Sequence, residues 1–559
     1  MANLVSPGVQ VKEIDLTNVV PSVSTTAGAM AGAFAWGTVN EVVTVSSETQ
    51  LIETFGKPDA NTFESVLSAA QFLSYGSSLK VVRATGADAR NSTVSGTGIL
   101  TQNKTVFDGQ SPAAGDWAQA RYPGITGNAV GVSVLTATQT PTAWQALYVE
   151  GLAGTSSGAA AVGGSNDEIH IWVYDTNGTI TGTAGTVLET WTYLSQASDV
   201  KGTDGSSLYY KDVINAGSKW VYIGNHAAAL TKAGQSATSN AFVHVASFFV
   251  ALAGGVDDNV LTVGETTLGL GYFADAETMD MSLMFQTNSS LSAADNRTLG
   301  NYITALCAAR KDAVGFISPE RAATVNVTAA AAQTAVAAWR TASTSTSYGF
   351  ADSSSLYVYD KYNDVYRWIA AAGSTAGLTA NADLVADAWF SPAGFTRGNV
   401  RNVTKLAWNP NQAARDALYK TGVNPIVTFP GSGTVLFGDK TLQSKPSAFD
   451  RINVRRLFIV LEKAVSTASK ASLFEFNDEF TRAQFRNMVE PFLRDVKGRR
   501  GITDFKVVCD GTNNTGAIID TNKFVADIYV KPARSINYIT LNFIATRTGV
   551  EFSEIAGGN

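Results

Sequence analysis

Both ends of the chain carry a short strand pattern, and this feature restricts the folds open to the sequence more than any other. Near the start, a Ser-Pro-Gly turn at 6–8 is followed by Val9 and Val11, which alternate with polar residues. Near the other end, Val550 and Phe552 alternate in the same way. Such alternation is typical of a half-buried strand. Because a strand this short is not stable alone, we expect each end to join the edge of a sheet, in the same molecule or in another one.

Two separated segments, 25–88 and 240–344, show the alternation of helices and strands that is typical of an α/β layer. The first segment holds an amphipathic helix pattern at 63–76, which ends at a glycine, and a strand pattern follows at 79–84. In the second segment, a helix pattern runs directly into a strand pattern over 299–318. We therefore predict a middle α/β domain that is built from both segments.

The intervening segment, 89–239, has a different composition. It holds 20 of the 50 glycines, and turn signals separate short apolar runs such as 169–175 and 220–224. The tryptophans in these runs argue for a packed core and against a flexible linker. The sequence predicts a β-rich domain that is inserted into the middle domain.

The last segment, 345–559, carries strong helix and strand patterns, and we assign the N-terminal arm, 1–24, to the same domain. Helix patterns cover 452–476 and 477–501, and strand patterns follow at 505–510, 524–530 and 536–552. The chain is therefore predicted to be a multidomain protein of the α/β and α+β classes. It combines this α+β domain with the middle α/β domain and the inserted β-rich domain.

The second of these helices has a clear charge order and an apolar face. Asn477 is the predicted N-cap, with two acidic residues in the first turn and basic residues at the other end. A helix dipole favours this order of charges. The aromatic and methionine side chains predicted to lie on or near one apolar face are Phe480, Phe485, Met488 and Phe492.

Charge is distributed unevenly along the chain, whose net charge is −6. Residues 440–559 carry 18 Lys and Arg against 13 Asp and Glu, whereas residues 1–439 carry 23 against 34. The basic excess favours a charged partner for the C-terminal region, or ion pairing within the molecule. The basic Gly-Arg-Arg-Gly loop at 498–501 likewise fits an acidic partner or simple exposure to solvent.

No motif for catalysis, metal binding or cofactor binding stands out. The three histidines lack metal-binding spacing, and there is no nucleophile elbow, phosphate loop or complete dinucleotide fingerprint. Gly431 and Gly433 are interpreted as a loop tip, and Asp383 and Asp387 as solvated carboxylates one helical turn apart. We therefore expect no enzyme activity, no cofactor and no metal.

Nucleic-acid and membrane partners are not expected either. The aromatic run at 356–368 includes interleaved basic residues, but its strand-and-turn alternation and the acidic chain favour core and interface packing over base stacking. No apolar run reaches the about 18–20 residues of a membrane span, and no secretory signal pattern is present. Cys307 and Cys509 are expected to be buried, free thiols, which suits a reducing cytoplasm.

Several long motifs, in order along the chain, resemble the tail sheath proteins of contractile-tailed bacteriophages, and most closely the T4-like branch. The resemblance covers the N-terminal arm, residues 25–88 and nearly everything after 345, and it is poor over 89–239. The motifs that carry it are SPGVQVKEIDL at 6–16, DKYNDVYRWIAAAGSTAGL at 360–378, WFSPAGFTRGNVRNVTKLAWNP at 389–410, ALYKTGVNPIV at 417–427, LFGDKTLQSKPSAFDRINVRRLF at 436–458 and VVCDGTNNTGAIIDTNKFVADIYVKPARSINYITLNFIATRTGVEF at 507–552.

The resemblance implies a structural role in the virion. In this family the C-terminal domain is the inner one, and the subunits form stacked six-membered rings around a tail tube. Contraction of this sleeve drives the tube through the host envelope, and no nucleotide is consumed. The implied partners are other copies of the chain, the tail tube protein, and the baseplate and tail terminator proteins, with assembly in the host cytoplasm.

The resemblance also assigns expected roles to individual residues. Val9, Val11 and Ile14 in the N-terminal arm, and Val550 and Phe552 in the C-terminal arm, are expected to add strands to sheets of neighbouring subunits. The expected hinges are Pro21 and Gly549, and the candidate residues facing the tube are Arg494, Lys497, Arg499 and Arg500.

Three alternatives stay open at this point. A related contractile injection particle would use a homologous sheath subunit, although a secretion sheath is typically built of two different proteins. A subtilisin-like hydrolase fits the suggested likeness of the middle of sheath proteins to that fold, but it lacks support from catalytic motifs. A surface-layer lattice protein is disfavoured by the missing signal pattern.

Overall fold

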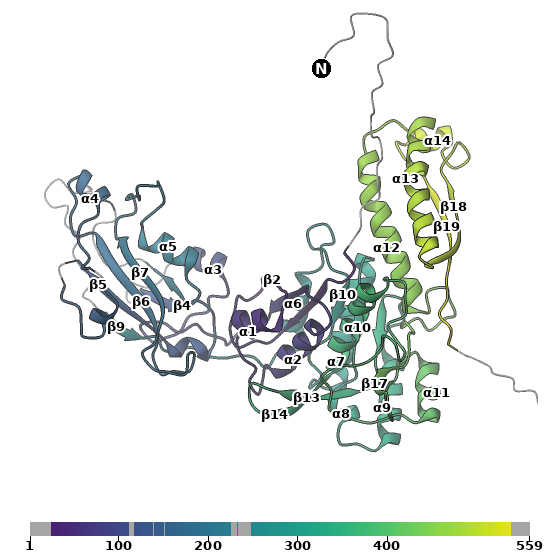
Figure 1. Ribbon diagram of the computed structural model, residues 1–559, viewed down its shortest axis with the longest axis horizontal. Coiled ribbons are helices and arrows are strands. Elements are labelled where there is room, and N and C mark those ends of the chain that lie inside the picture. The colour runs from purple at the N-terminus through teal and green to yellow at the C-terminus, as the bar shows by residue number, and fades with distance from the viewer. Residues whose placement is uncertain are drawn as a thin grey trace, which may run out of the picture. The chain divides into compact units, whose positions relative to one another are not determined.

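The computed structural model describes residues 24–110, 117–137, 139–149, 151–224, 232 and 248–537. The predicted arm residues Val9, Val11, Ile14, Val550 and Phe552, and the predicted hinges Pro21 and Gly549, lie outside these residues. The chain divides into two compact units, Val20–Ala471 and a second unit that comprises Met1–Val19 and Ser472–Asn559 (Figure 1).

A six-stranded sheet forms the centre of the larger unit. All neighbouring strands run parallel, except β2, which runs antiparallel to β3 at one edge. In their order across the sheet, the strands are β12 (Gly349–Ala351), β11 (Val314–Ile317), β10 (Leu283–Phe285), β1 (Gly28–Gly32), β3 (Leu79–Arg83) and β2 (Val42–Val45). The sheet thus combines strands from segments on both sides of 89–239. The sheet also takes in β12, which lies beyond residue 344.

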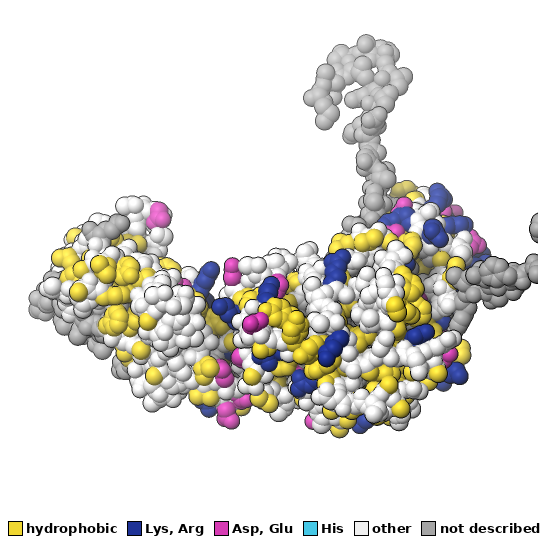
Figure 2. Space-filling view, turned by 60° about the horizontal axis from the view of Figure 1, so that its bottom comes forward, with side chains coloured by type: hydrophobic (Ala, Val, Ile, Leu, Met, Phe, Trp, Pro, Cys, Tyr) yellow, Lys and Arg dark blue, Asp and Glu magenta, His cyan; other side chains and the backbone are white. Residues whose placement is uncertain are grey.

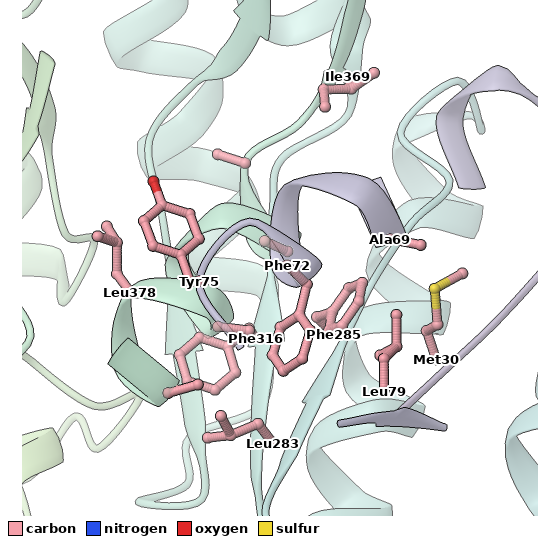
Figure 3. Packing of buried hydrophobic residues seen from close by; sticks show 14 of the residues in the cluster. Met30, Ala69, Phe72, Tyr75, Leu79, Leu283, Phe285, Phe316, Ile369 and Leu378 are labelled. Carbon is pink, nitrogen blue, oxygen red and sulfur yellow. The ribbon is translucent and has the colours of Figure 1, made fainter. Parts of the chain in front are cut away.

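Helices cover both faces of this sheet. α2 (Phe63–Leu73) and α10 (Ala372–Val385) pack on one face, where Phe72 stacks on Phe285 with ring centroids 5.3 Å apart (Figure 3). A Cβ at Gly28 would come within 2.4 Å of the Phe72 ring, so only glycine allows this close approach. The helices on the opposite face are α6 (Val263–Gly271), α7 (Ala293–Arg310) and α9 (Ala329–Ala342). Both faces therefore bury apolar side chains, as a parallel sheet requires.

The segment between β3 and α6 is rich in β structure, and its sheet extends beyond the predicted end at residue 239, because β9 pairs with β5. Its main sheet is antiparallel, in the order β7 (Val187–Ser195), β6 (Glu168–Asp175), β5 (Val130–Thr136) and β9 (Phe248–Ala251), and β4 (Ala118–Ala120) pairs with β8 (Val221–Ile223). The short helices of this segment are α3 (Lys104–Gly109), α4 (Ser157–Ala161) and α5 (Tyr210–Gly217). The core of this segment includes Val132, Ile171 and Ile214, which excludes a flexible linker.

The remaining elements of the larger unit include two hairpins. β13 (Ser355–Asp360) pairs with β14 (Val365–Ala370) and with the short β15 (Lys405–Leu406), which confirms the strand and turn predicted at 356–368. β16 (Ile426–Phe429) and β17 (Gly433–Leu436) form the second hairpin, whose turn holds Gly431 as predicted. The helices not yet located are α1 (Glu48–Phe55), α8 (Arg321–Thr324), α11 (Gln412–Thr421) and α12 (Ile452–Ser469).

The smaller unit contains α13 (Glu479–Gly498), β18 (Ile502–Val508), α14 (Gly516–Ile519) and β19 (Asp527–Pro532). Two of the three predicted strands, those at 505–510 and 524–530, are present with shifted bounds, whereas the third, at 536–552, lies almost entirely outside the described residues. The two predicted helices end earlier than their patterns suggest. Both cysteines are buried and free, as predicted. No helix among the described residues is long and apolar enough to cross a bilayer.

Asp383 contradicts its prediction as a solvated carboxylate. Its side chain is almost fully buried on α10 and forms an ion pair with Arg456 on α12. Arg456 also donates to the carbonyl oxygens of Thr25, at 3.0 Å, and Thr379, at 3.3 Å. The spacing of Asp383 and Asp387 could not show this, because the cation that pairs with Asp383 lies 73 positions away. Asp387 is partly exposed.

A second buried carboxylate, Asp352, has no cation beside it among the described residues. It directly follows β12, accepts a hydrogen bond from the Ser318 hydroxyl at 2.5 Å, and accepts another from the Ser354 amide at 3.3 Å. Burial raises its pKa to about 7, although both hydrogen bonds act in the opposite direction. The side chain is therefore protonated over much of the acidic range in the folded chain.

We expect the variant Asp352→Asn to remove a pH dependence of stability. The folded chain keeps this proton up to about pH 7, whereas the unfolded chain releases it near about pH 4,. The free energy of unfolding of the natural chain therefore falls between these values, by at most about 1.4 kcal/mol per pH unit. Thermal unfolding should show the variant melting higher at pH 8, with a difference that shrinks toward pH 4. Parallel pH profiles of the two chains would contradict titration of Asp352.

Candidate assembly surface

In the described part of the smaller unit, the long helix α13 packs on a two-stranded sheet. α13 lies on β18 and buries Phe485, Met488, Leu493 and Val496. Phe485 also meets Phe524 edge to face, with ring centroids 5.4 Å apart. Helix and sheet thus share a small apolar core, which holds the strands in place.

The sheet of this unit has open edges within the described chain. β18 and β19 pair antiparallel from Asp504 opposite Lys531 to Val508 opposite Asp527, with an irregularity near Ile502. Each strand has one neighbour among the described residues, so within that part of the chain no strand pairs with the outer edge of either one. An open edge is a template for a further strand.

The start of α13 differs from its predicted cap. Asp478, and not Asn477, is the N-cap, because its carboxylate accepts a hydrogen bond from the Thr481 amide at 2.8 Å. The side chain of Asn477 donates instead to the carbonyl oxygen of Lys523 at 2.8 Å and to Asn514 at 3.2 Å. Both residue types cap helices well, so the choice depends on the loop before β19, which engages Asn477.

Phe480 is exposed by 73%, so its assignment to the apolar face was wrong. Phe485 lies five positions after Phe480, which places the two side chains about 140° apart around the helix. Phe480 belongs with an exposed apolar segment just before the helix, whose other members are Leu473, Phe474 and Phe476. Exposed apolar groups of this extent are characteristic of interaction surfaces. The sequence signal that could have indicated this exposed surface was the mixture of apolar and charged residues just before the helix cap.

The four predicted tube-facing residues lie in the last turn of α13 and the loop after it, and all are exposed. Lys497 lies 3.4 Å from Asp504, and Arg499 lies 3.5 Å from Asp495. The Lys497 ammonium donates to Asp504 and lowers the pKa of that carboxyl. Arg494 and Arg500 have no carboxylate within ion-pair distance among the described residues. Basic and acidic side chains are thus interspersed on this unit (Figure 2), and exposed pairs of this kind are weak.

The structure describes the surroundings of His170, and they give no support to the hydrolase alternative. The Nδ1 atom accepts a hydrogen bond from the Tyr193 amide at 3.2 Å, so Nε2 carries the proton and faces the Gly151 carbonyl oxygen at 3.1 Å. Burial lowers the pKa of this imidazole. Both ring nitrogens are therefore engaged by backbone groups, and neither is available to a serine hydroxyl. No cluster of metal-ligating side chains occurs within the described part of the chain.

Three protein-family profiles match consecutive parts of the chain. The tail sheath protein Gp18 domain III N-terminal region matches residues 25–84, the phage tail sheath protein central domain matches 274–442, and the phage tail sheath C-terminal domain matches 444–546. These three matches do not cover 89–239, the segment over which the sequence resemblance is poor.

Solved structures show the same fold at low sequence identity. The crystal structure of a sheath tail protein from Listeria innocua has a TM-score of 0.56 and 13% identity, covering 92% of this chain and 93% of that one. The contracted helical sheath of the anti-feeding prophage has a TM-score of 0.50 and 12% identity, covering 98% and 100%. These matches confirm a mixed α/β fold of the sheath type.

Curated relatives match over nearly the full length. The tail sheath protein of Enterobacteria phage T4 is 34% identical over an alignment of 657 positions, which covers 99% of both chains. The tail sheath protein of Vibrio phage KVP40 is 32% identical over an alignment of 700 positions, which covers 99% of this chain and 100% of the relative. Both relatives are structural sheath proteins by name. The chain therefore belongs to the tail sheath protein family of T4-like bacteriophages.

Proposed function

We propose that this contractile tail sheath subunit polymerises around the tail tube as stacked hexameric rings, and that contraction of the sleeve drives the tube through the host envelope during genome delivery. The chain is assembled in the host cytoplasm and becomes part of the virion. Its partners are other copies of itself, the tail tube protein, and the baseplate and tail terminator proteins.

The observation that carries this proposal is the open-edged ladder of β18 and β19 in a chain whose two ends carry strand patterns. Val9, Val11 and Ile14 of one subunit add a strand to the ladder of a neighbour, and Val550 and Phe552 of another subunit add a strand as well. Pro21 and Gly549 act as the hinges of the arms. Such contacts join unlike surfaces, so they continue as an open helical array and do not close as a dimer.

The binding free energy of two arms per subunit keeps the subunits of the array connected while they move. Each added strand contributes roughly 4–6 backbone hydrogen bonds at about 0.5–1.5 kcal/mol each. Two arms engaged at once give avidity, because release of one strand leaves the subunit tethered by the other. Subunits can therefore shift during contraction while they stay connected.

Negative-stain electron microscopy of the full chain, at several protein and salt concentrations, tests the assembly. We expect regular tubes or stacked rings, either from the chain alone or after tail tube protein is added as a template. Dispersed particles under every condition, with tube protein present, would refute the proposal.

Reversing the charges of Arg494, Lys497, Arg499 and Arg500 to glutamate is expected to weaken binding to the tail tube. Reversal of four exposed charges should lower the apparent affinity by about tenfold or more. The loss should be larger at low salt, because salt screens exposed charges. Co-sedimentation of sheath subunits with preformed tubes measures the effect.

The matched control reverses four exposed lysines of the larger unit and changes the net charge equally. These are Lys57, Lys201, Lys420 and Lys445. This control should bind tubes like the natural chain. Equal binding by both variants would show that the basic end of α13 does not face the tube.

A sheath subunit of a related contractile injection particle is the second candidate. The observation that favours it is the fold shared with the anti-feeding prophage sheath, at a TM-score of 0.50. The two relatives with identities of 32% and 34% are phage proteins, which favours the phage tail.

A further inference from the structure

The central sheet changes its direction of winding between β1 and β10. From β1 the chain passes through α2 to β3 on one side, whereas from β10 it passes through α7 to β11 on the other side. α2 and α7 lie on opposite faces of the sheet. The connections thus leave neighbouring parallel strands in opposite directions, which opens a crevice at their carboxyl ends. In open α/β sheets, ligands bind at this topological switch point.

A cavity of about 310 Å³ lies at this position, and we call it the switch-point cavity. Its lining includes Gly32 at the end of β1 and Ala33 just after it, Thr287 and Asn288 just after β10, and Arg321 after β11. The Thr287 hydroxyl donates to the carbonyl oxygen of Ala31 at 3.1 Å, which holds the two strand ends together. The volume lies at the lower end of the range for small-molecule sites, about 300–1,000 Å³.

Asn259 lines this cavity with an unsatisfied side chain. The residue is 5% exposed, and neither its Oδ1 nor its Nδ2 has a hydrogen-bond partner among the described residues. Its loop is firmly held, because Asp257 accepts a hydrogen bond from the Ile125 amide at 2.9 Å and Asp258 accepts one from the Asp88 amide at 3.0 Å. Buried polar groups are normally paired, so a fixed and buried carboxamide facing a cavity indicates a missing partner.

The charged groups of the wall neutralise each other. Glu64 lies 2.9 Å from Arg321, and it accepts hydrogen bonds from the amide and the hydroxyl of Ser289, at 2.6 and 3.2 Å. No excess charge is left to attract an ion. The remaining wall is apolar where Phe63, Leu261 and Leu291 line it.

We infer that the switch-point cavity binds a neutral amide group. The carboxamide of Asn259 offers a donor and an acceptor side by side, and a primary amide, which also holds an N–H and its C=O on the same side, offers the complementary pair, so two antiparallel hydrogen bonds can form. The apolar wall accommodates a small aliphatic group next to the amide. The amide is carried either by a free small molecule or by another copy of the chain.

Thermal unfolding with N-acetyl-L-leucinamide, a neutral amide with one aliphatic side chain, tests this inference. We expect the probe to raise the Tm of the full, unassembled chain with saturable concentration dependence, because a ligand that binds only the folded state stabilises it. The variant Asn259→Leu, which removes both polar atoms at nearly equal size, should lower the probe affinity at least about tenfold. A probe in which every amide N–H, including both on the terminal carboxamide, is replaced by N–CH3 lacks the donor and should lose binding to the natural chain to a similar extent.

Electron microscopy of assembled Asn259→Leu distinguishes the two sources of the amide. Normal tubes point to a free small molecule, and defective assembly of a folded variant points to an amide from a neighbouring copy. The inference is overturned if the probe leaves the Tm of the natural chain unchanged, which would make the cavity a pocket for water only. It is also overturned if the methylated probe binds equally well.

Discussion

A chain that lacks residues 1–15 is expected to remain folded and to form no tubes. Its unfolding temperature should stay close to that of the full chain, because the described cores of both units are built from residues after 24. Its assembly should fail, because each subunit loses the strand proposed to complete the β18–β19 ladder of a neighbour. Loss of about four backbone hydrogen bonds, at about 1 kcal/mol each, weakens association about a thousandfold.

Two double variants test whether assembly requires the apolar side of the N-terminal arm or only the presence of the arm. In a strand, Val9 and Val11 point to one side and Gln10 and Lys12 to the other. We expect V9D/V11D to abolish tubes, because two carboxylates would be placed against an apolar surface, whereas Q10D/K12D should retain assembly. Electron microscopy together with sedimentation measures both. Normal tubes from the deleted chain, or equal effects of the two double variants, would contradict the arm proposal.

The variant Arg456→Met is expected to destabilise the larger unit by about 3–5 kcal/mol, because it leaves Asp383 buried and unpaired. The carboxylate and the guanidinium are both almost fully inaccessible. Arg456 also holds the carbonyl oxygen of Thr25, so its loss releases one tie between α12 and the described start of the chain. Chemical denaturation, followed by tryptophan fluorescence, measures the change in the free energy of unfolding.

Two further variants show whether the unpaired charge is the cause. R456M/D383L removes both charges and should recover most of the lost stability, because apolar replacements of a buried pair are often neutral. Lys463→Met on the same helix breaks an ion pair with the half-exposed Asp280, and it should cost at most about 1 kcal/mol. If the double variant is as unstable as R456M, the effect comes from packing and not from charge.

Elements whose stability depends on local pattern were predictable from the sequence. α2 and β3 lie where the helix and strand patterns at 63–76 and 79–84 place them. The glycine-rich segment is rich in β structure, as its short apolar runs between turn signals indicated, and the structure shows that these strands pair antiparallel. Long sequence motifs also indicated the family, which the comparisons confirm. The predicted roles of the arms, hinges and tube-facing residues stay predictions.

Partners that are distant in the chain were decided by the tertiary structure alone. β1 pairs with β10 across about 250 residues, and Arg456 reaches Asp383 across 73. The switch-point cavity exists only because strand order brings Gly32, Asn259 and Thr287 together. The physical reason is that the periodicity of a segment shows which face of that helix or strand is apolar. Which other element packs against this face depends on packing and electrostatics between segments that are distant in the chain, and the periodicity of one segment carries no information on this. The same reason explains why Asp383 appeared solvated in the sequence and is buried in the fold.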